Sequence, residues 1–127
     1  MTTWRYRVVV CGGRSYTNAE RVTAALEAVL KRQPMMTLAD CGDKGTGALA
    51  RSWAALRGVP CRSYPADETT HGRRAEIIRN QYMLKRANPH LVIAFPGGAH
   101  TAHLVRVAKK AGYTVSEMGP DPKGETK

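Results

Sequence analysis

The chain has 127 residues, a length typical of one domain and sufficient to bury a hydrophobic core. Its composition, 43% hydrophobic, 24% charged and 6% aromatic, excludes a disordered tail, a collagen-like fibre and a disulfide-stapled mini-protein. The net charge of +10 at pH 7 favours anionic partners such as phosphates, nucleotides or nucleic acid. The alternative is a small basic protein that charge repulsion simply keeps soluble.

Targeting signals and metal motifs are not evident in the sequence. No apolar run approaches the ~20 residues of a membrane span, and the first residues lack the pattern of a signal peptide. We therefore expect a cytoplasmic protein with no membrane partner. The three cysteines, Cys11, Cys41 and Cys61, form no CxxC pair, so we expect neither a zinc site nor a redox motif. We expect all three thiols to be buried and reduced.

The first half of the chain alternates between β-rich runs and amphipathic patterns. Residues 5–11 (RYRVVVC) predict a buried strand, and the capping-box spacing of residues 17–20 predicts a helix that begins at Thr17. Its apolar positions recur with helical spacing as far as Leu30. Residues 35–41 predict a weaker strand, followed by a helix through residues 48–56 that Gly58 ends.

The second half repeats this alternation. Residues 59–64 predict a short strand, 66–72 a polar loop and 73–87 a third helix. Residues 91–95 (LVIAF) predict a strand, 101–111 a helix and 113–118 a last strand. We expect one domain over residues 1–118 and a flexible tail over 119–127. Five strands alternating with four helices predict a Rossmann-like, doubly wound α/β domain, with a mostly parallel five-stranded sheet and helices on both faces.

Three glycine-rich turns each separate a predicted strand from a helix, at residues 11–16, 42–47 and 96–101. In a parallel sheet such turns meet at one edge, where ligands bind. Glycine allows a close backbone approach, and the first N–H groups of a helix bind anions, so we expect a phosphorylated ligand. No turn has the Walker pattern or GxGxxG spacing, which excludes P-loop ATP hydrolysis and ordinary NAD-dependent redox chemistry.

A basic cluster lies at residues 71–83 (HGRRAEIIRNQYM). Arg73 and Arg74 stand near the predicted start of a helix, where a cation opposes the helix dipole unless an anion lies nearby. Arg79 and Asn80 follow on the same helix, and a solvated basic face is the alternative. His100 and His103 could share a helix face, but no complete metal set accompanies them, so we expect His100 to contact a phosphate or a base.

Carboxylates could give the site a catalytic role. Glu76 lies within the Arg-rich helix and Asp43 lies in the second glycine turn. Two approaching carboxylates can act as nucleophile and acid on a glycosidic bond. The alternative is that both are solvating groups.

Four segments together carry a family resemblance: VVVCGGRSYT, GDKGTGALA, HGRRAEIIRNQYML and VIAFPGGAHTA. From residue 6 to about 118 the chain resembles the small YspA-like branch of the SLOG superfamily, the Rossmann-like group that includes the DprA proteins and the LOG phosphoribohydrolases. The resemblance implies a nucleotide or nucleotide-derived ligand at the carboxyl edge of the sheet. Members of the superfamily bind such ligands, cleave N-glycosidic bonds or bind DNA, and many form dimers or larger assemblies.

Two departures from the family pattern argue against a LOG-type hydrolase. The LOG turn has a catalytic Glu three residues beyond its Thr, and Leu104 occupies that position. The YspA-like second loop usually has an Asp where this chain has Gly47.

We therefore expect, in order, a nucleotide-binding module, an enzyme acting on N-glycosidic bonds, and a nucleic-acid-binding protein. We expect no metal and no cofactor, and a homo-oligomer (dimer or tetramer). Nucleic acid ranks last because Trp53, Tyr82 and Phe95 are predicted to lie in the core, which leaves no stacking platform. The candidate catalytic residues are Glu76 and Asp43, and the candidate ligand-binding residues are Gly12, Gly13, Arg14, Gly42, Lys44, Gly45, Arg73, Arg79, Asn80, Pro96, Gly97, Gly98, His100 and Thr101.

Overall fold

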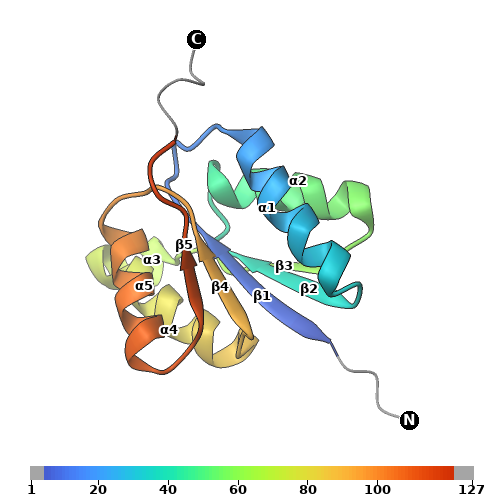
Figure 1. Cartoon of the computed structure of the whole chain (residues 1–127). Coiled ribbons are helices and arrows are strands. Elements are labelled where there is room, and N and C mark those ends of the chain that lie inside the picture. Colours follow the sequence, from blue (N-terminus) through green and yellow to red (C-terminus); the bar gives the residue numbers. More distant parts are fainter. Residues whose placement is uncertain (1–4, 122–127) are drawn as a thin grey trace.

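A five-stranded, all-parallel sheet with helices on both faces forms the protein (Figure 1). The computed structural model describes residues 5–121. Helices α1 and α2 cover one face of the sheet and α4 and α5 cover the other. The elements are β1 (Tyr6–Cys11), α1 (Ala19–Arg32), β2 (Met36–Asp40), α2 (Thr46–Arg57), β3 (Cys61–Ser63), α3 (Glu68–His71), the 3-10 turn η1 (Gly72–Arg74), α4 (Ala75–Ala87), β4 (Leu91–Ala94), α5 (Ala99–Lys110) and β5 (Val115–Glu117). The predicted Rossmann-like α/β fold is confirmed.

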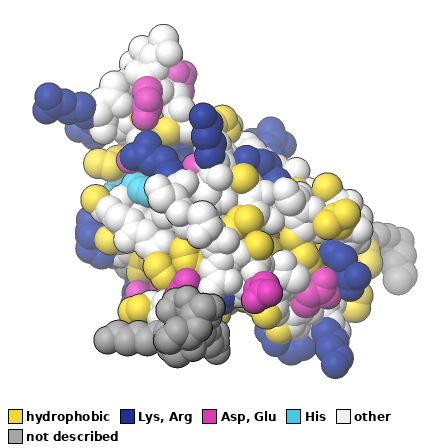
Figure 2. All heavy atoms as spheres, turned by 90° about the horizontal axis from the view of Figure 1, so that it is seen from above, with side chains coloured by type: hydrophobic (Ala, Val, Ile, Leu, Met, Phe, Trp, Pro, Cys, Tyr) yellow, Lys and Arg dark blue, Asp and Glu magenta, His cyan; other side chains and the backbone are white. Residues whose placement is uncertain are grey.

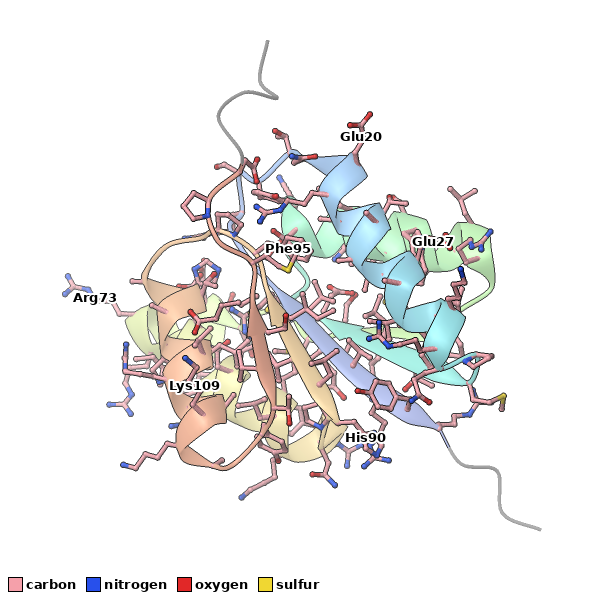
Figure 3. All side chains as sticks on the ribbon, in the orientation of Figure 1. Glu20, Glu27, Arg73, His90, Phe95 and Lys109 are labelled. Carbon is pink, nitrogen blue, oxygen red and sulfur yellow. The ribbon has the colours of Figure 1, made fainter. Side chains whose placement is uncertain are left out.

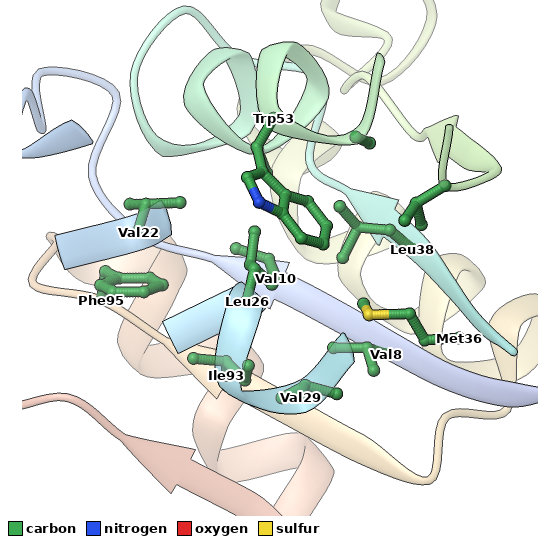
Figure 4. Packing of buried hydrophobic residues seen from close by; sticks show 13 residues of the cluster. Val8, Val10, Val22, Leu26, Val29, Met36, Leu38, Trp53, Ile93 and Phe95 are labelled. Atoms are coloured by element: carbon green, nitrogen blue, oxygen red, sulfur yellow. The ribbon is translucent and has the colours of Figure 1, made fainter. Parts of the chain in front are cut away.

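The central strand β1 contributes to two cores because its side chains alternate between the faces of the sheet. Val8 and Val10 pack under α1 and α2, in the cluster shown in Figure 4, which includes Trp53. Val9 and Cys11 pack against α4 and α5 on the other face. A strand buried on both faces explains the continuous apolar run in the sequence.

The strand order β3-β2-β1-β4-β5 brings the three glycine turns to one edge. Val10 pairs with Asp40 of β2 and with Ile93 of β4, so the three strands end level with one another. The turns that follow them therefore emerge side by side, as the alternation of strands and helices along the sequence predicts.

The start of α1 differs from its predicted position, and the short helix α3 was not predicted. Asn18 rather than Thr17 is the N-cap of α1, and its side chain accepts a hydrogen bond of 3.0 Å from the Arg21 N–H. The predicted polar loop 66–72 contains α3, which Asp67 caps by accepting from the Thr70 N–H at 3.1 Å. Asn and Asp cap helices as well as Ser or Thr, so local sequence left several N-cap positions open.

Two residues that the sequence predicts to be buried are exposed in the structure. Cys11 and Cys41 are buried, but Cys61 is exposed because β3 is an edge strand. Trp53 and Phe95 are buried, whereas Tyr82 is 54% exposed on the outer side of α4. A tyrosine with helical spacing can face either the sheet or solvent, and the packing of α4 decides which.

The segment after β5 contacts α1 as far as it is described. Arg21 donates to the Gly119 carbonyl and to Asp121 at 2.6 Å each, and Tyr16 donates to Asp121 at 2.8 Å. These contacts hold part of the predicted tail, and residues 122–127 lie outside the described region. Among residues 5–121, no helix combines the length and apolar character that crossing a membrane requires.

Candidate functional site

Two adjoining hollows form a cleft at the carboxyl edge of the sheet. The larger, of ≈ 510 Å³, lies between the loop after β1 and the start of α5. The smaller, of ≈ 200 Å³, lies between the loop after β2 and α4. Arg14, Glu76 and His100 line both hollows, so the two are continuous. Figure 2 looks onto this edge, where Lys and Arg side chains lie near His and acidic side chains.

The three glycine turns are packed directly against one another. The Gly13 N–H donates to the Pro96 carbonyl at 2.9 Å, and the Gly13 carbonyl accepts from the Thr46 N–H and hydroxyl at 3.1 Å each. A Cβ on Gly12, Gly45 or Gly97 would overlap atoms of a neighbouring turn or helix start. The overlaps are with Thr46 Oγ1 for Gly12, with the Gly13 carbonyl for Gly45 and with Thr101 Oγ1 for Gly97. These glycines therefore allow the turns to pack closely against one another. A Cβ on Gly98, by contrast, would meet open space.

The N-terminus of α2 is occupied by a carboxylate of the protein itself. Asp43 Oδ1 accepts hydrogen bonds from the Gly45 and Gly47 N–H groups at 3.0 and 2.9 Å. An anion at this helix end is stabilised by the N–H groups and the dipole, so Asp43 fills the place that a phosphate could take. Lys44 is exposed and lines neither hollow.

The N-terminus of α5, by contrast, has no side-chain cap within the described chain. Gly98 is its N-cap, and the Ala102 N–H is the first to bond within the helix, to the Gly98 carbonyl at 3.1 Å. The N–H groups of residues 99–101, in the first turn of the helix, therefore have no intrahelical acceptor. Thr101 is only 5% exposed, and its hydroxyl has no hydrogen-bond partner among the described residues. His100 Nε2 is likewise buried and without a described partner.

Arg79 places a buried positive charge beside the cleft. It is 6% exposed, and its Nη1 donates to the carbonyls of Cys41 at 2.7 Å and Tyr64 at 3.3 Å. Its Nε donates to Asn80 Oδ1 at 2.8 Å. No carboxylate of residues 5–121 forms an ion pair with it. A buried cation without an anion is costly, which makes Arg79 a candidate for contact with an anionic ligand.

Asn80 connects α4 to α5 rather than lining the cleft. It is fully buried, and its Nδ2 donates to the His100 carbonyl at 3.0 Å and lies 3.1 Å from His103 Nδ1. Asn80 therefore holds the start of α5 in place, which is a positioning role at the candidate site.

Both candidate carboxylates line the smaller hollow. Glu76 forms an ion pair with Arg14, with 3.5 Å between Oε2 and Nη2. Asp43 has one oxygen committed to α2, while its Oδ2 is buried without a described partner. The structure thus brings two acidic groups to the same hollow, one of them held by the backbone and the other by an arginine.

The remaining candidates occupy different places. Arg73 is exposed and extends away from the molecule (Figure 3), so it lines neither hollow. Gly42 lines the smaller hollow, and its φ of +74° places it in the left-handed region that favours glycine. Gly13, Pro96, Gly97 and Gly98 line the larger hollow.

A buried acid, Asp40, lies beneath the second turn and was not among the residues predicted for the site. Asp40 is 0% exposed, and it accepts hydrogen bonds from Arg51 Nη1 at 2.8 Å and from the Gly42 N–H at 2.6 Å. A Cβ on Gly47 would lie 3.1 Å from Asp40 Oδ1 and 3.0 Å from Asp43 Oδ1. Position 47 has therefore no room for the Asp expected from the family pattern unless these neighbours move. The only sequence signal was an acid at the end of a strand.

Leu104, at the position of the LOG catalytic Glu, packs into the core instead of lining the cleft. It is 0% exposed and belongs to the core between the sheet and α4 and α5. A carboxylate at this position would be buried among apolar side chains at a large desolvation cost. Within residues 5–121, no group of three or more His, Cys, Asp or Glu residues could hold a metal ion.

Comparison with known proteins identifies the family. A family model described as "YspA, cpYpsA-related SLOG family" matches residues 6–71, just over half of the chain. The matched region runs from β1 through α3 and includes the first two glycine turns. No curated protein matches the chain. The matched region and the fold together place this chain in the YspA, cpYpsA-related SLOG family.

Proposed function

We propose that the cleft binds a nucleotide or nucleotide-derived ligand, with a phosphate at the start of α5. The observation that carries this proposal is the N-terminus of α5, where neither the helix end nor the buried Thr101 hydroxyl has a side-chain partner among residues 5–121. Backbone N–H groups, the helix dipole and a hydroxyl donor form a set that suits a phosphate. Gly98 leaves open space next to these donors.

Positive charge around the cleft supports the same ligand class. Arg14 lines both hollows, and Arg79 supplies a buried guanidinium that lacks an ion pair within the described chain. An anionic ligand would compensate this charge, and the net charge of +10 would attract it from solution.

The first test is a thermal-shift screen at moderate salt against nucleoside mono-, di- and triphosphates, NAD, ADP-ribose and cyclic nucleotides. A ligand at a hundred times its Kd stabilises the fold by about 2.7 kcal/mol, which corresponds to several degrees for a domain of this size. A panel without any shift would contradict the proposal. Affinity for nucleic acid that falls steeply with salt would then favour binding by charge attraction.

A pair of variants tests the placement of the phosphate. Ala99 is the first residue of α5, so Ala99→Pro removes one backbone N–H at a position where proline suits a helix. Ala99→Val adds bulk but keeps the N–H group. We expect Ala99→Pro to weaken binding of the best phosphorylated ligand about tenfold, and Ala99→Val to weaken it less. Equal effects of the two variants would place the phosphate elsewhere.

A second candidate function is cleavage of an N-glycosidic bond, because Glu76 lines both hollows. In this reading Glu76 would act as the nucleophile or acid, with Asp43 in the same hollow. Release of free base from the bound nucleotide, abolished in Glu76→Gln, would establish the enzyme. Binding without base release would leave a binding module. Assembly into a dimer or tetramer remains a prediction.

A further inference from the structure

We propose that a third hollow, beyond β3, is an aromatic subsite for the base of a nucleoside diphosphate or triphosphate. This inference rests on the proposed function, since the phosphates of the same ligand would occupy the cleft. The hollow has a volume of ≈ 420 Å³ and lies between the chain after β3, α3 and the outer side of α4.

Two tyrosines form the aromatic wall of this hollow. Tyr64 is buried, whereas Tyr82 is exposed, and their ring centroids lie 6.0 Å apart with the planes at 66°. Pro65, Ala75 and Ile78 complete the apolar lining. Because the two planes are steeply inclined, the exposed Tyr82 ring supplies the flat face on which a base can stack, and Tyr64 lies edge-on beside it.

Charged groups make this hollow suited to a base rather than to an aliphatic side chain. The Arg62 guanidinium lies 5.8 Å from the centroid of the Tyr64 ring, and a guanidinium plane also stacks on bases. Asp67 and His71 line the hollow and can bond the heteroatoms at the edge of a base. Asp67 accepts from the Thr70 N–H through Oδ1, and its second carboxylate oxygen can accept from an amino group of a base.

The hollow continues into the cleft through Arg79 and Pro65, which line both it and the smaller hollow. From the end of β3 to the end of β4 the sheet crosses three strand spacings, about 14 Å. A ligand that reaches from the aromatic hollow to the start of α5 therefore needs more than one phosphate beyond its sugar. Arg79 lies between the two ends, where the phosphates of such a ligand would pass.

The test compares ADP with pyrophosphate, which carries the anionic part without the base, by calorimetry on the full chain. We expect ADP to bind about 5- to 150-fold more tightly than pyrophosphate, since stacking of one base contributes this much. Tyr82→Ala should remove most of that difference without changing pyrophosphate binding, and Tyr82→Phe should retain it. Gln81→Ala, an exposed neighbour on α4 that lines none of the three hollows, is the control.

The outcomes separate the subsite from the proposed function. Equal binding of ADP and pyrophosphate would overturn the subsite and leave the phosphate site standing. A Tyr82→Ala variant that weakens both ligands equally would also overturn it, because the effect would then be structural. Binding of neither ligand, nor of any compound in the wider screen, would overturn both proposals. A changed association state of Tyr82→Ala in sedimentation, with ADP binding intact, would identify the hollow as an interface and overturn the subsite.

Discussion

Arg14 and Glu76 form an ion pair across the opening that the two hollows of the cleft share. The pair joins the loop after β1 to the first turn of α4, with 3.5 Å between its charged atoms. The Arg14 side chain is 61% exposed and that of Glu76 is 28% exposed, so the pair is weak and can be exchanged. A phosphate entering the cleft would compete with Glu76 for the arginine.

Glu76→Gln should therefore bind phosphorylated ligands more tightly than the unmodified protein. Removing one carboxylate frees Arg14, and an exposed ion pair is worth about 0.2–1 kcal/mol, so we expect an increase of up to about fivefold in affinity. Calorimetry with ADP measures the change. Glu20→Gln removes an equal charge from an exposed residue in the first turn of α1 (labelled in Figure 3), which lines neither hollow, and should have a smaller effect. Equal gains in the two variants would show that only net charge matters.

Thr101→Val should change stability and binding in opposite directions. The hydroxyl of Thr101 is buried without a described partner, and its removal by a residue of the same shape should stabilise the fold by about 1 kcal/mol. Loss of the donor should weaken binding of the phosphorylated ligand. Urea unfolding and calorimetry measure the two effects, with the exposed Thr23→Val on α1 as control. A destabilised variant would mean that the hydroxyl has a partner in solution.

Stability should decrease as pH falls below 6.5 because two histidines are held neutral. Burial, and secondly the Arg106 charge, lower the pKa of His103 below its ordinary 6.5. Burial, and secondly Arg7, do the same for the pKa of His90. With a lowered folded pKa, the unfolded chain binds protons first, so the contribution is complete above 6.5 and is lost as pH falls toward the folded pKa.

Urea unfolding at several pH values between 7.5 and 5 measures this dependence. His103 Nδ1 lies 3.1 Å from Asn80 Nδ2, a donor, so neutral His103 accepts this bond and the protonated ring cannot. His103→Gln should therefore reduce the slope of stability against pH. An unchanged slope in this variant would contradict the assignment to His103.

Cys61 should react slowly with alkylating agents although it is exposed. Partial burial, the nearby Asp40 charge and a hydrogen bond of 3.3 Å from its thiol to Asp40 Oδ2 raise its pKa to about 12. Since the thiolate is the reactive form, iodoacetamide at pH 8 should label Cys61 in the folded protein far more slowly than in urea. Peptide mapping by mass spectrometry locates the label. Equal rates in the two states would contradict the raised pKa.

Local patterns were sufficient for the architecture. The β-branched run of β1 and the apolar stripe of α1 are properties of neighbouring residues, and their alternation along the chain implies a parallel α/β sheet. The placement of Gly13, Gly42 and Gly98 at the cleft follows from this topology, because all parallel strands end at the same edge. Helix starts were less certain, as Asn18 shows.

By itself, then, the sequence determined the fold class, the edge that carries the site and the residue types that meet there. Only the tertiary structure decided which of these residues are free to bind. Asp43 caps α2, Asn80 holds α5, and Tyr82 turns outward beside Tyr64. The roles of Asn80 and Tyr82 depend on partners that are distant along the chain. The role of Asp43 depends on the exact path of the second glycine turn. Hydrophobic periodicity describes how a segment meets the core, but it contains no information about which polar groups of different segments satisfy one another.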